Sequence, residues 1–361
     1  MDNNKLKKLK PYHVIFLVQN SMVALGLLSL PNELSSMGYS QWWIPLMLGI
    51  IANLTLIPII WLFQRYPQDN LFTLNEKLIG KFLGKILNTF LVVYLIFFIA
   101  SIVEGYLDLI KIIALPDRTI AGPLVVFFIV LLYIVHGGIK SIARFCILSF
   151  FLTIWMAYFL QWSILEGDIR HLMPVSNFTF HEFLVASRNG YFAICGYELI
   201  MTYFPYIINQ KKAFKHASIG IWITITLYFS VTVVSVMYFT EWQLEEVIYP
   251  ILKLYKAVEL SYAERIDVLG ISLWVLLILS STAAYLWVAK KGMDALRSNN
   301  KTYHLYVIAI CIFVFVMIPL SKDFQEAFYD NLFYIKFSII LWPNILIFLH
   351  LIKSKRKQAS A

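Results

Sequence analysis

Ten apolar runs, each close to the length of a membrane-spanning helix, restrict the fold of this chain more than any other feature. A hydrocarbon core about 30 Å thick is crossed by roughly 20 apolar helical residues. Only 14% of the 361 residues are charged, whereas soluble domains carry about 25%. The sequence therefore predicts an integral membrane protein. The expected spans are 13–30, 42–63, 86–103, 119–136, 145–165, 183–208, 217–239, 266–290, 303–320 and 332–352.

Basic residues alternate between the two sides of this predicted topology. Of the 30 Lys and Arg residues, 21 fall in the N-terminal segment, the C-terminal segment and every second loop between spans. Cytoplasmic loops carry an excess of Lys and Arg, so we expect both termini on the cytoplasmic side. The net charge of +9 is explained by this arrangement, and we expect no nucleic-acid partner.

Other residue patterns exclude several kinds of site. Cys146, Cys195 and Cys311 lie in or beside predicted spans and form no C-x-x-C pair, so we expect no disulfide framework and no structural zinc. The loops are too short for a catalytic domain and hold no defensible Ser-His-Asp, His-rich or paired acidic motif. We expect neither an enzyme nor a cofactor or metal.

Helix-breaking residues occur in the first and sixth spans. Gly26 and Pro31 lie in the first span, and Gly196 and Pro205 lie in the sixth. Glycine in a span can simply allow close helix packing, but these spans begin two halves of five spans each. An odd number of spans forces the halves to insert in opposite directions, as in transporters whose binding site lies at paired broken helices. We expect an all-α polytopic membrane fold, a 5+5 inverted repeat, with halves at about 13–165 and 183–352.

Glu198 is the carboxylate that the predicted topology places deep within a span, directly after Gly196 and Tyr197. A charge at that depth is costly and must be protonated, paired or in contact with water. Glu198 is therefore a candidate ligand-binding residue, and a structural role in holding the sixth span against a neighbour is equally compatible with its position.

Three stretches together resemble a known family: Gly26 to Pro31, Gly196-Tyr197-Glu198, and Glu264-Arg265-Ile266-Asp267. They are similar to stretches of the spore germination receptor B subunits (GerAB-like), which belong to the amino acid–polyamine–organocation permease superfamily with its LeuT-like fold. The resemblance implies a spore inner membrane protein that binds a small germinant, commonly an amino acid. It also implies partners, namely a receptor A subunit and a lipoprotein C subunit, and a role in triggering germination.

The same resemblance implies a central cavity surrounded by spans one, three, six and eight. On span three, Tyr94 and Phe98 share a face, as Ser281 and Tyr285 do on span eight. Free N–H groups at a helix break suit a ligand carboxylate, and carbonyls, hydroxyls or Glu198 suit an ammonium. The candidate ligand-binding residues are Gly26, Tyr94, Phe98, Gly196, Tyr197, Glu198, Ser281 and Tyr285.

Several alternatives remain open at this point. Aromatic residues on a membrane helix usually serve packing, and the hydroxyls at 280–282 could instead mark a sodium site. Span five lacks the lysine that some relatives carry. A germinant sensor and an active amino-acid transporter could use one pocket.

Two further expectations concern the outer segments. Residues 241–265 are expected to form an amphipathic helix on the outer surface, and Glu104, Asp108 and Lys111 a solvated ion-pair surface. Arg188 is a candidate for attracting an anionic group.

Overall fold

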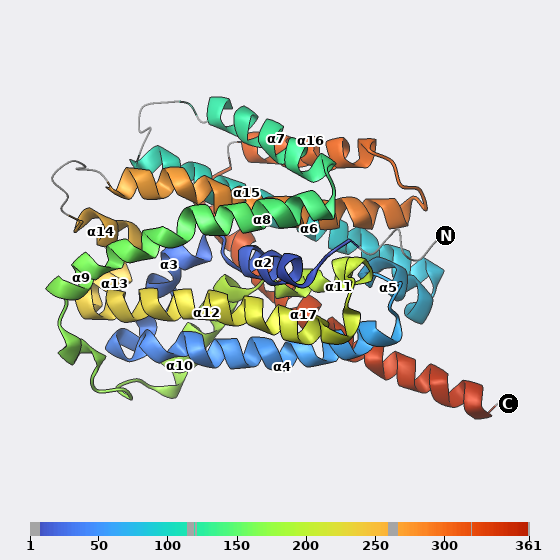
Figure 1. The fold of residues 1–361 in the computed structure, drawn as a ribbon, viewed down its shortest axis with the longest axis horizontal. Coiled ribbons are helices and arrows are strands. Elements are labelled where there is room, and N and C mark those ends of the chain that lie inside the picture. Colours follow the sequence, from blue (N-terminus) through green and yellow to red (C-terminus); the bar gives the residue numbers. More distant parts are fainter. Residues whose placement is uncertain (1–7, 114–118, 120, 259–265, 319, 360–361) are drawn as a thin grey trace.

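The computed structural model describes residues 8–113, 119, 121–258, 266–318 and 320–359, which fold into a bundle of long helices. Most helices run along the long axis of the molecule, and both marked chain ends lie at the same end (Figure 1). Within the described residues, the only extended pairing is a single bridge between Leu9 and Ile207. The fold is therefore an all-α membrane bundle.

The helices account for the ten predicted spans. Six stretches are individually long and apolar enough to cross a membrane: 35–65, 81–112, 139–166, 210–238, 266–296 and 327–354. A seventh is a pair of helices, α2 (Pro11–Met22) and α3 (Gly26–Glu33), bent by 51°. Two shorter apolar helices, α7 (Ala121–His136) and α16 (Tyr303–Met317), occupy the predicted fourth and ninth spans. The sixth is an interrupted stretch from α10 (Phe180–Ile194) to η5 (Phe204–Tyr206).

Seven α-helices belong to the six individually long stretches. They are α4 (Ile44–Arg65), α6 (Lys81–Ile113), α8 (Ile139–Thr153), α9 (Leu160–Glu166), α12 (Ala213–Tyr238), α15 (Ile266–Leu296) and α17 (Lys322–Ala359). The longest exceed the roughly 20 residues that a bilayer requires.

A short helix that hydropathy did not predict, α5 (Leu71–Ile79), lies between α4 and α6. The Asn70 side chain accepts a hydrogen bond from the Thr73 amide at 3.0 Å, and Thr73 Oγ1 accepts one from the Asn70 amide at 2.9 Å. This reciprocal capping satisfies the first amides of the helix. Gly80, with φ +111°, ends it, so α5 is a defined element.

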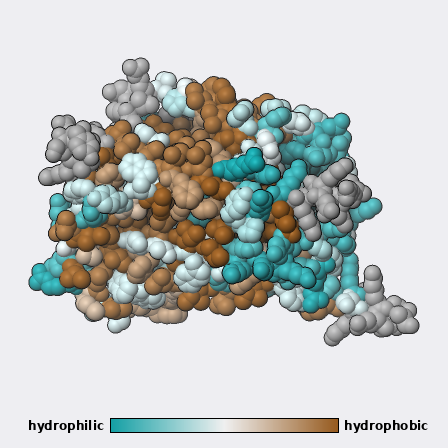
Figure 2. Space-filling model, in the orientation of Figure 1, coloured by the Kyte–Doolittle hydropathy of each residue, from teal (hydrophilic) through white to brown (hydrophobic). Residues whose placement is uncertain are grey.

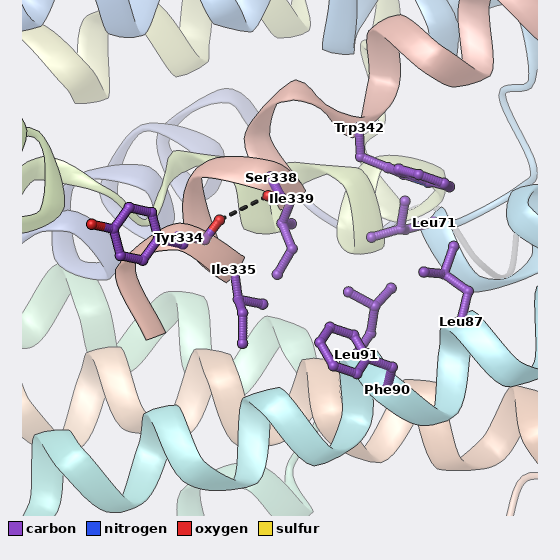
Figure 3. Close-up of a pocket in the computed structure, with 9 residues that line it drawn as sticks. All are labelled: Leu71, Leu87, Phe90, Leu91, Tyr334, Ile335, Ser338, Ile339 and Trp342. Carbon is purple, nitrogen blue, oxygen red and sulfur yellow. Dashed lines mark hydrogen bonds between the residues drawn. The ribbon is translucent and has the colours of Figure 1, made fainter. Parts of the chain in front are cut away.

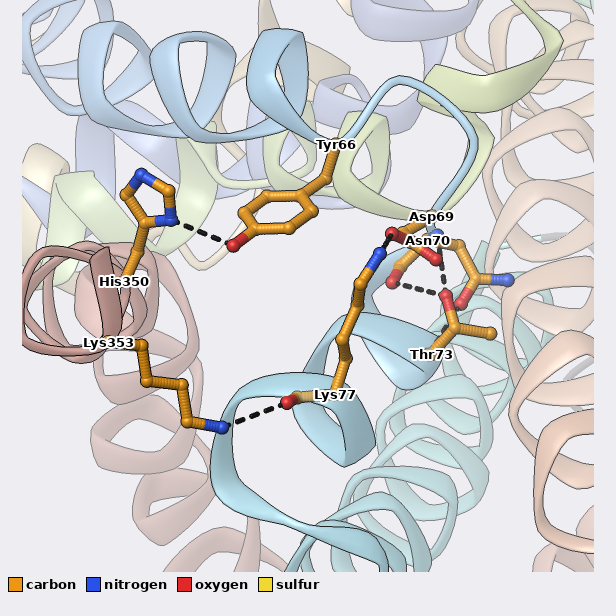
Figure 4. Close-up of polar contacts among 7 residues, drawn as sticks. All are labelled: Tyr66, Asp69, Asn70, Thr73, Lys77, His350 and Lys353. Carbon is orange, nitrogen blue, oxygen red and sulfur yellow. Dashed lines mark hydrogen bonds and ion pairs between the residues drawn. The ribbon is translucent and has the colours of Figure 1, made fainter. Parts of the chain in front are cut away.

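Polar side chains gather at the end of the bundle that carries α5 and both termini, here called the basic end (Figures 1 and 2). Tyr66 and His350 are hydrogen-bonded at 2.7 Å, and Lys353 donates to the Lys77 carbonyl at 3.1 Å (Figure 4). These contacts join α17 to α5 and to the end of α4. The Leu9 amide also donates to the Tyr206 carbonyl at 2.9 Å. The basic end is thus held together by contacts between segments distant in sequence.

At the opposite end of the bundle, the structure differs from the expected amphipathic surface helix. Two short helices, α13 (Glu241–Glu246) and α14 (Pro250–Lys256), replace it. Ile251, Leu254 and Tyr255 are buried, since α14 packs against α3 and α15. Its apolar face thus meets protein, and Glu264 and Arg265 lie outside the described residues.

Candidate functional site

Both interrupted spans contain a glycine at the interruption. Helix α2 ends at Met22 and α3 starts at Gly26. Helix α10 ends at Ile194, and a short 3₁₀ turn resumes at Tyr197 after Gly196, whose φ is +145°. L-residues with a side chain rarely adopt that φ, so glycine is the residue that this break requires.

The two breaks contact one another. A Cβ atom on Gly196 would lie 2.2 Å from the Ser21 carbonyl oxygen, and one on Gly26 would lie 2.8 Å from that of Ala193. Close packing and helix interruption, which the sequence left as alternatives for these glycines, are therefore both present. Two segments of irregular backbone meet inside the protein, where such backbone is tolerated.

Side chains from two other helices satisfy carbonyl groups that the breaks release. The Tyr228 hydroxyl of α12 donates to the Met22 carbonyl at 3.2 Å and to the Ala193 carbonyl at 3.0 Å. From α15, Trp274 Nε1 donates to the Ala24 carbonyl at 3.1 Å. Buried carbonyls are normally paired, so these two residues hold the geometry of both breaks.

A cavity of about 280 Å³ adjoins the breaks. Drug-sized ligand sites span about 300–1,000 Å³, so this volume suits a small metabolite. The cavity runs from Ser21 and Met22 toward Glu33 and Ile248, and Ile248 is 60% exposed. It therefore extends from the breaks toward the end opposite the basic end. Its other lining residues are Ala24, Leu25, Gly26, Ser29, Phe98, Ser101, Ile102, Asn189, Phe192, Ala193, Cys195, Tyr249, Tyr285, Tyr329 and Lys336.

Aromatic rings and one lysine form a wall of the cavity. The rings of Phe98 on α6 and Tyr285 on α15 lie 4.8 Å apart, edge to face. Lys336 of α17 places its Nζ atom 4.0 Å from the centroid of the Phe98 ring and is only 3% exposed. The sequence interpretation missed Lys336, although a single lysine inside the last apolar run was a usable signal.

Glu198 lies behind this wall. Its Oε2 accepts a hydrogen bond from the Gly196 amide at 2.7 Å, and the Tyr285 hydroxyl donates to Oε1 at 3.3 Å. Glu198 and Tyr94 line a separate void of about 30 Å³ that Tyr285 also borders. Within the described residues, the buried Tyr94 hydroxyl has no hydrogen-bond partner. Tyr285 thus separates the larger cavity from the void that contains Glu198.

Besides Tyr94, Gly196 and Glu198, two more candidate residues, Tyr197 and Ser281, do not line the cavity. The Tyr197 hydroxyl is hydrogen-bonded at 2.6 Å to both Thr55 and Tyr191, so its ring points toward α4. Ser281 is fully buried and donates to the Ile278 carbonyl of its own helix at 3.0 Å. Neither residue is part of the cavity wall. Ser281 does not line the cavity that Tyr285 borders, and its short side chain bonds to its own helix.

The suggested sodium-site hydroxyls also have partners in the protein. Ser280 donates to Asn20 Oδ1 at 2.8 Å, which ties α15 to α2. Thr282 donates to the Ile278 carbonyl at 2.6 Å. Among the described residues, no group of three or more His, Cys, Asp or Glu side chains could hold a metal ion.

The expected solvated surface near the outer end of span three is corrected at Glu104 only, because Asp108 and Lys111 are exposed. Glu104 is only 9% exposed, and its carboxylate accepts a hydrogen bond from the Tyr329 hydroxyl of α17. Glu104 therefore joins α6 to α17. Arg188 lies 5.0 Å from the centroid of the Tyr334 ring and does not line the cavity.

A second hollow, of about 290 Å³, lies between α6 and α17 (Figure 3). Its wall is mostly apolar and contains Phe90 and Trp342. Tyr334 and Ser338 contribute polar atoms, but Ser338 donates to the Tyr334 carbonyl at 2.8 Å. This hollow lacks the released backbone and the charge of the first cavity.

Two interrupted helices that meet beside a mostly apolar cavity place this membrane bundle in the class of proteins with the LeuT-like fold. Two solved transporters share the fold. Mhp1, a nucleobase-cation-symport-1 family transporter in a closed conformation with bromovinylhydantoin bound, superposes with TM-score 0.68 at 12% identity over 95% of this chain and 78% of Mhp1. MhsT in complex with L-phenylalanine gives TM-score 0.63 at 17% identity over 93% and 87%.

The sequence itself identifies the family. The family described as "Spore germination protein" matches residues 8–325, and the chain belongs to it. Relatives include spore germination protein GerQB of Bacillus cereus, 24% identical over 85% of each chain. Another is spore germination protein A2 of Bacillus subtilis (strain 168), 25% identical over 96% of this chain and 97% of the relative.

Proposed function

We propose that this chain is the permease-like subunit of a spore germinant receptor, and that a small nutrient germinant, an amino acid, binds in the cavity beside the two breaks. The observation that carries this proposal is the contact of Gly196 with the Ser21 backbone at the inner end of a cavity of about 280 Å³. Irregular main chain beside a cavity is the arrangement that transporters use for small substrates.

The ligand's two charged groups would meet different parts of the break. Gly26 begins α3 and lines the cavity, and the first amides of a helix favour an anion such as a carboxylate. Carbonyl oxygens near Ser21 and Met22 would accept from the ammonium, while Phe98 and Tyr285 would contact the side chain. Glu198 would act indirectly, through its hydrogen bond with Tyr285.

The proposal includes the setting of the protein. The chain would lie in the spore inner membrane among membrane lipids with both termini cytoplasmic, because the basic end carries the excess of Lys and Arg. The two inverted halves would comprise about 13–165 and 183–352. Ligand binding would favour one arrangement of the breaks, and that change would pass to a receptor A subunit and a lipoprotein C subunit. The role is one of binding and signalling, without an enzymatic step.

A screen of nutrient triggers on spores with and without the gene tests this function. Loss of the response to particular amino acids on deletion, and its return on complementation, is expected. Spores that lack the gene but germinate normally with every nutrient would refute the proposal.

Active amino-acid transport is the second candidate. The void behind Tyr285 favours it, because spaces on both sides of one aromatic residue suit access from alternate sides of the membrane. Uptake of labelled amino acid into vesicles that contain the purified chain would support transport, and absence of uptake despite binding would support sensing.

A further inference from the structure

Lys336 is a buried cation without an anionic partner in the described part of the chain. Its side chain is 3% exposed, and it lines the cavity beside the breaks. Its ammonium group lies among aromatic rings: Nζ lies 4.0 Å from the Phe98 ring centroid, 5.2 Å from that of Phe192 and 5.5 Å from that of Tyr285. The ion pairs in the described residues involve other basic side chains.

Aromatic contacts compensate only part of the cost of burying this charge. A desolvated cation–π contact stabilises a buried ion by less than the effective cost of removing that ion from water. A buried charge is stable when it is paired and hydrogen-bonded. The three donors of an ammonium group therefore need an acceptor, and the cavity is the space in which one can be placed.

We propose that Lys336 is an anion-binding residue of the cavity and that the carboxylate group of the ligand, which the first amides of α3 also favour, pairs with it. The proposal rests on the proposed function, because it places the ligand in the same cavity. Lysine offers a compact point charge, whereas arginine offers a planar fork for two-point recognition. A cavity of about 280 Å³ that contains one lysine side chain suits a small ligand with one carboxylate group.

The aromatic wall favours carboxylates that carry an apolar group. Phe98, Phe192 and Tyr285 surround the ammonium, so an apolar group attached to the carboxylate would contact the rings while the charge meets Nζ. An isosteric neutral amide would lose the charge-assisted hydrogen bond. Such bonds contribute about 1.5–3 kcal/mol, which corresponds to about 10- to 150-fold in affinity.

The test compares two ligands of nearly identical shape, sodium butyrate and butyramide, on the purified full-length chain in detergent micelles. Sodium chloride at equal ionic strength controls for inorganic anions. The apparent dissociation constant is obtained from the rise of the unfolding midpoint with ligand concentration. Butyrate is expected to bind at least about 10-fold more tightly than butyramide, and chloride is expected to have little effect.

Three variants accompany the wild type. Lys336→Gln should remove the preference for butyrate, and Lys336→Arg should retain most of it. Lys353→Gln, on the same helix but outside the cavity, should leave it unchanged. Equal binding of butyrate and butyramide by the wild type, an equal effect of chloride, or a preference that persists in Lys336→Gln would overturn the inference. The wild-type comparison decides the question even if a variant fails to fold.

A failure of the Lys336 proposal can be distinguished from a failure of the proposed function. If butyrate binds through Lys336 but no amino acid triggers germination through this gene, the anion site stands and the amino-acid germinant is rejected. If amino acids act and their primary amides act equally well, the function stands and the role of Lys336 is rejected.

Discussion

Replacement of Gly196 by alanine directly tests the contact between the two breaks. The added methyl would lie 2.2 Å from the Ser21 carbonyl oxygen and 2.7 Å from the Met22 amide, at a residue with φ +145°. The unfavourable backbone conformation costs about 1–3 kcal/mol, and overpacking adds typically about 1–3 kcal/mol. The total is a large part of the roughly 5–15 kcal/mol by which proteins are stable.

Gly80→Ala provides the matched control. Gly80 also has a positive φ, +111°, but nothing lies within 4 Å of a Cβ atom built there. The Gly80→Ala variant should therefore lose free energy of unfolding only through its backbone conformation, by about 1–3 kcal/mol. The measurement is the free energy of unfolding of both purified variants in mixed micelles, and the excess loss in Gly196→Ala reports the steric contact.

Equal destabilisation by Gly196→Ala and Gly80→Ala would refute the reasoning. It would mean that the backbone at Ser21 moves aside without cost, so that the two breaks are not in firm contact. An excess of about 1–3 kcal/mol in Gly196→Ala, together with a loss of the germination response, would support it.

The remaining predictions concern the cavity and the void behind it. Glu198→Gln should slow germination without preventing membrane insertion, because it alters the group that accepts a hydrogen bond from the Gly196 amide; normal germination kinetics in such spores would exclude a functional role. Tyr285→Phe should lower the free energy of unfolding by about 0.5–1.5 kcal/mol, since it removes the hydrogen bond to Glu198; an unchanged value would show that the bond is dispensable. Phe98→Ala should admit bulkier nutrients, because it removes an aromatic wall of the cavity; an identical nutrient profile would argue against that wall.

Much of the fold could be predicted because the bilayer imposes simple rules on length and charge. The ten apolar runs and the glycines at both breaks followed from the sequence. Helix α5 was missed because its residues, such as Asn75 and Glu76, are too polar for a hydropathy search. The start of α17 at Lys322 was placed ten residues late, at Leu332, for the same reason.

The site was harder to predict because helical periodicity fails at an interruption. Tyr197 follows the Gly196 break, where the side-chain direction can no longer be counted from the preceding helix, and it points to Thr55. Ser281 shares a helical face with Tyr285, but its short side chain bonds to its own backbone. Lys336 was not predicted because the family resemblance implies a cavity between spans one, three, six and eight, whereas Lys336 lies in span ten.

The Tyr228 hydroxyl has one proton and two carbonyl acceptors, Met22 on one interrupted span and Ala193 on the other. Such a three-centre bond persists only while both oxygens stay within reach of the same atom. If occupancy of the cavity spread the two spans apart, the proton would remain with one carbonyl and leave the other unpaired. Helix α12 would then stay attached to only one of the two interrupted spans. Its position would depend on whether the cavity is occupied, although α12 does not line the cavity.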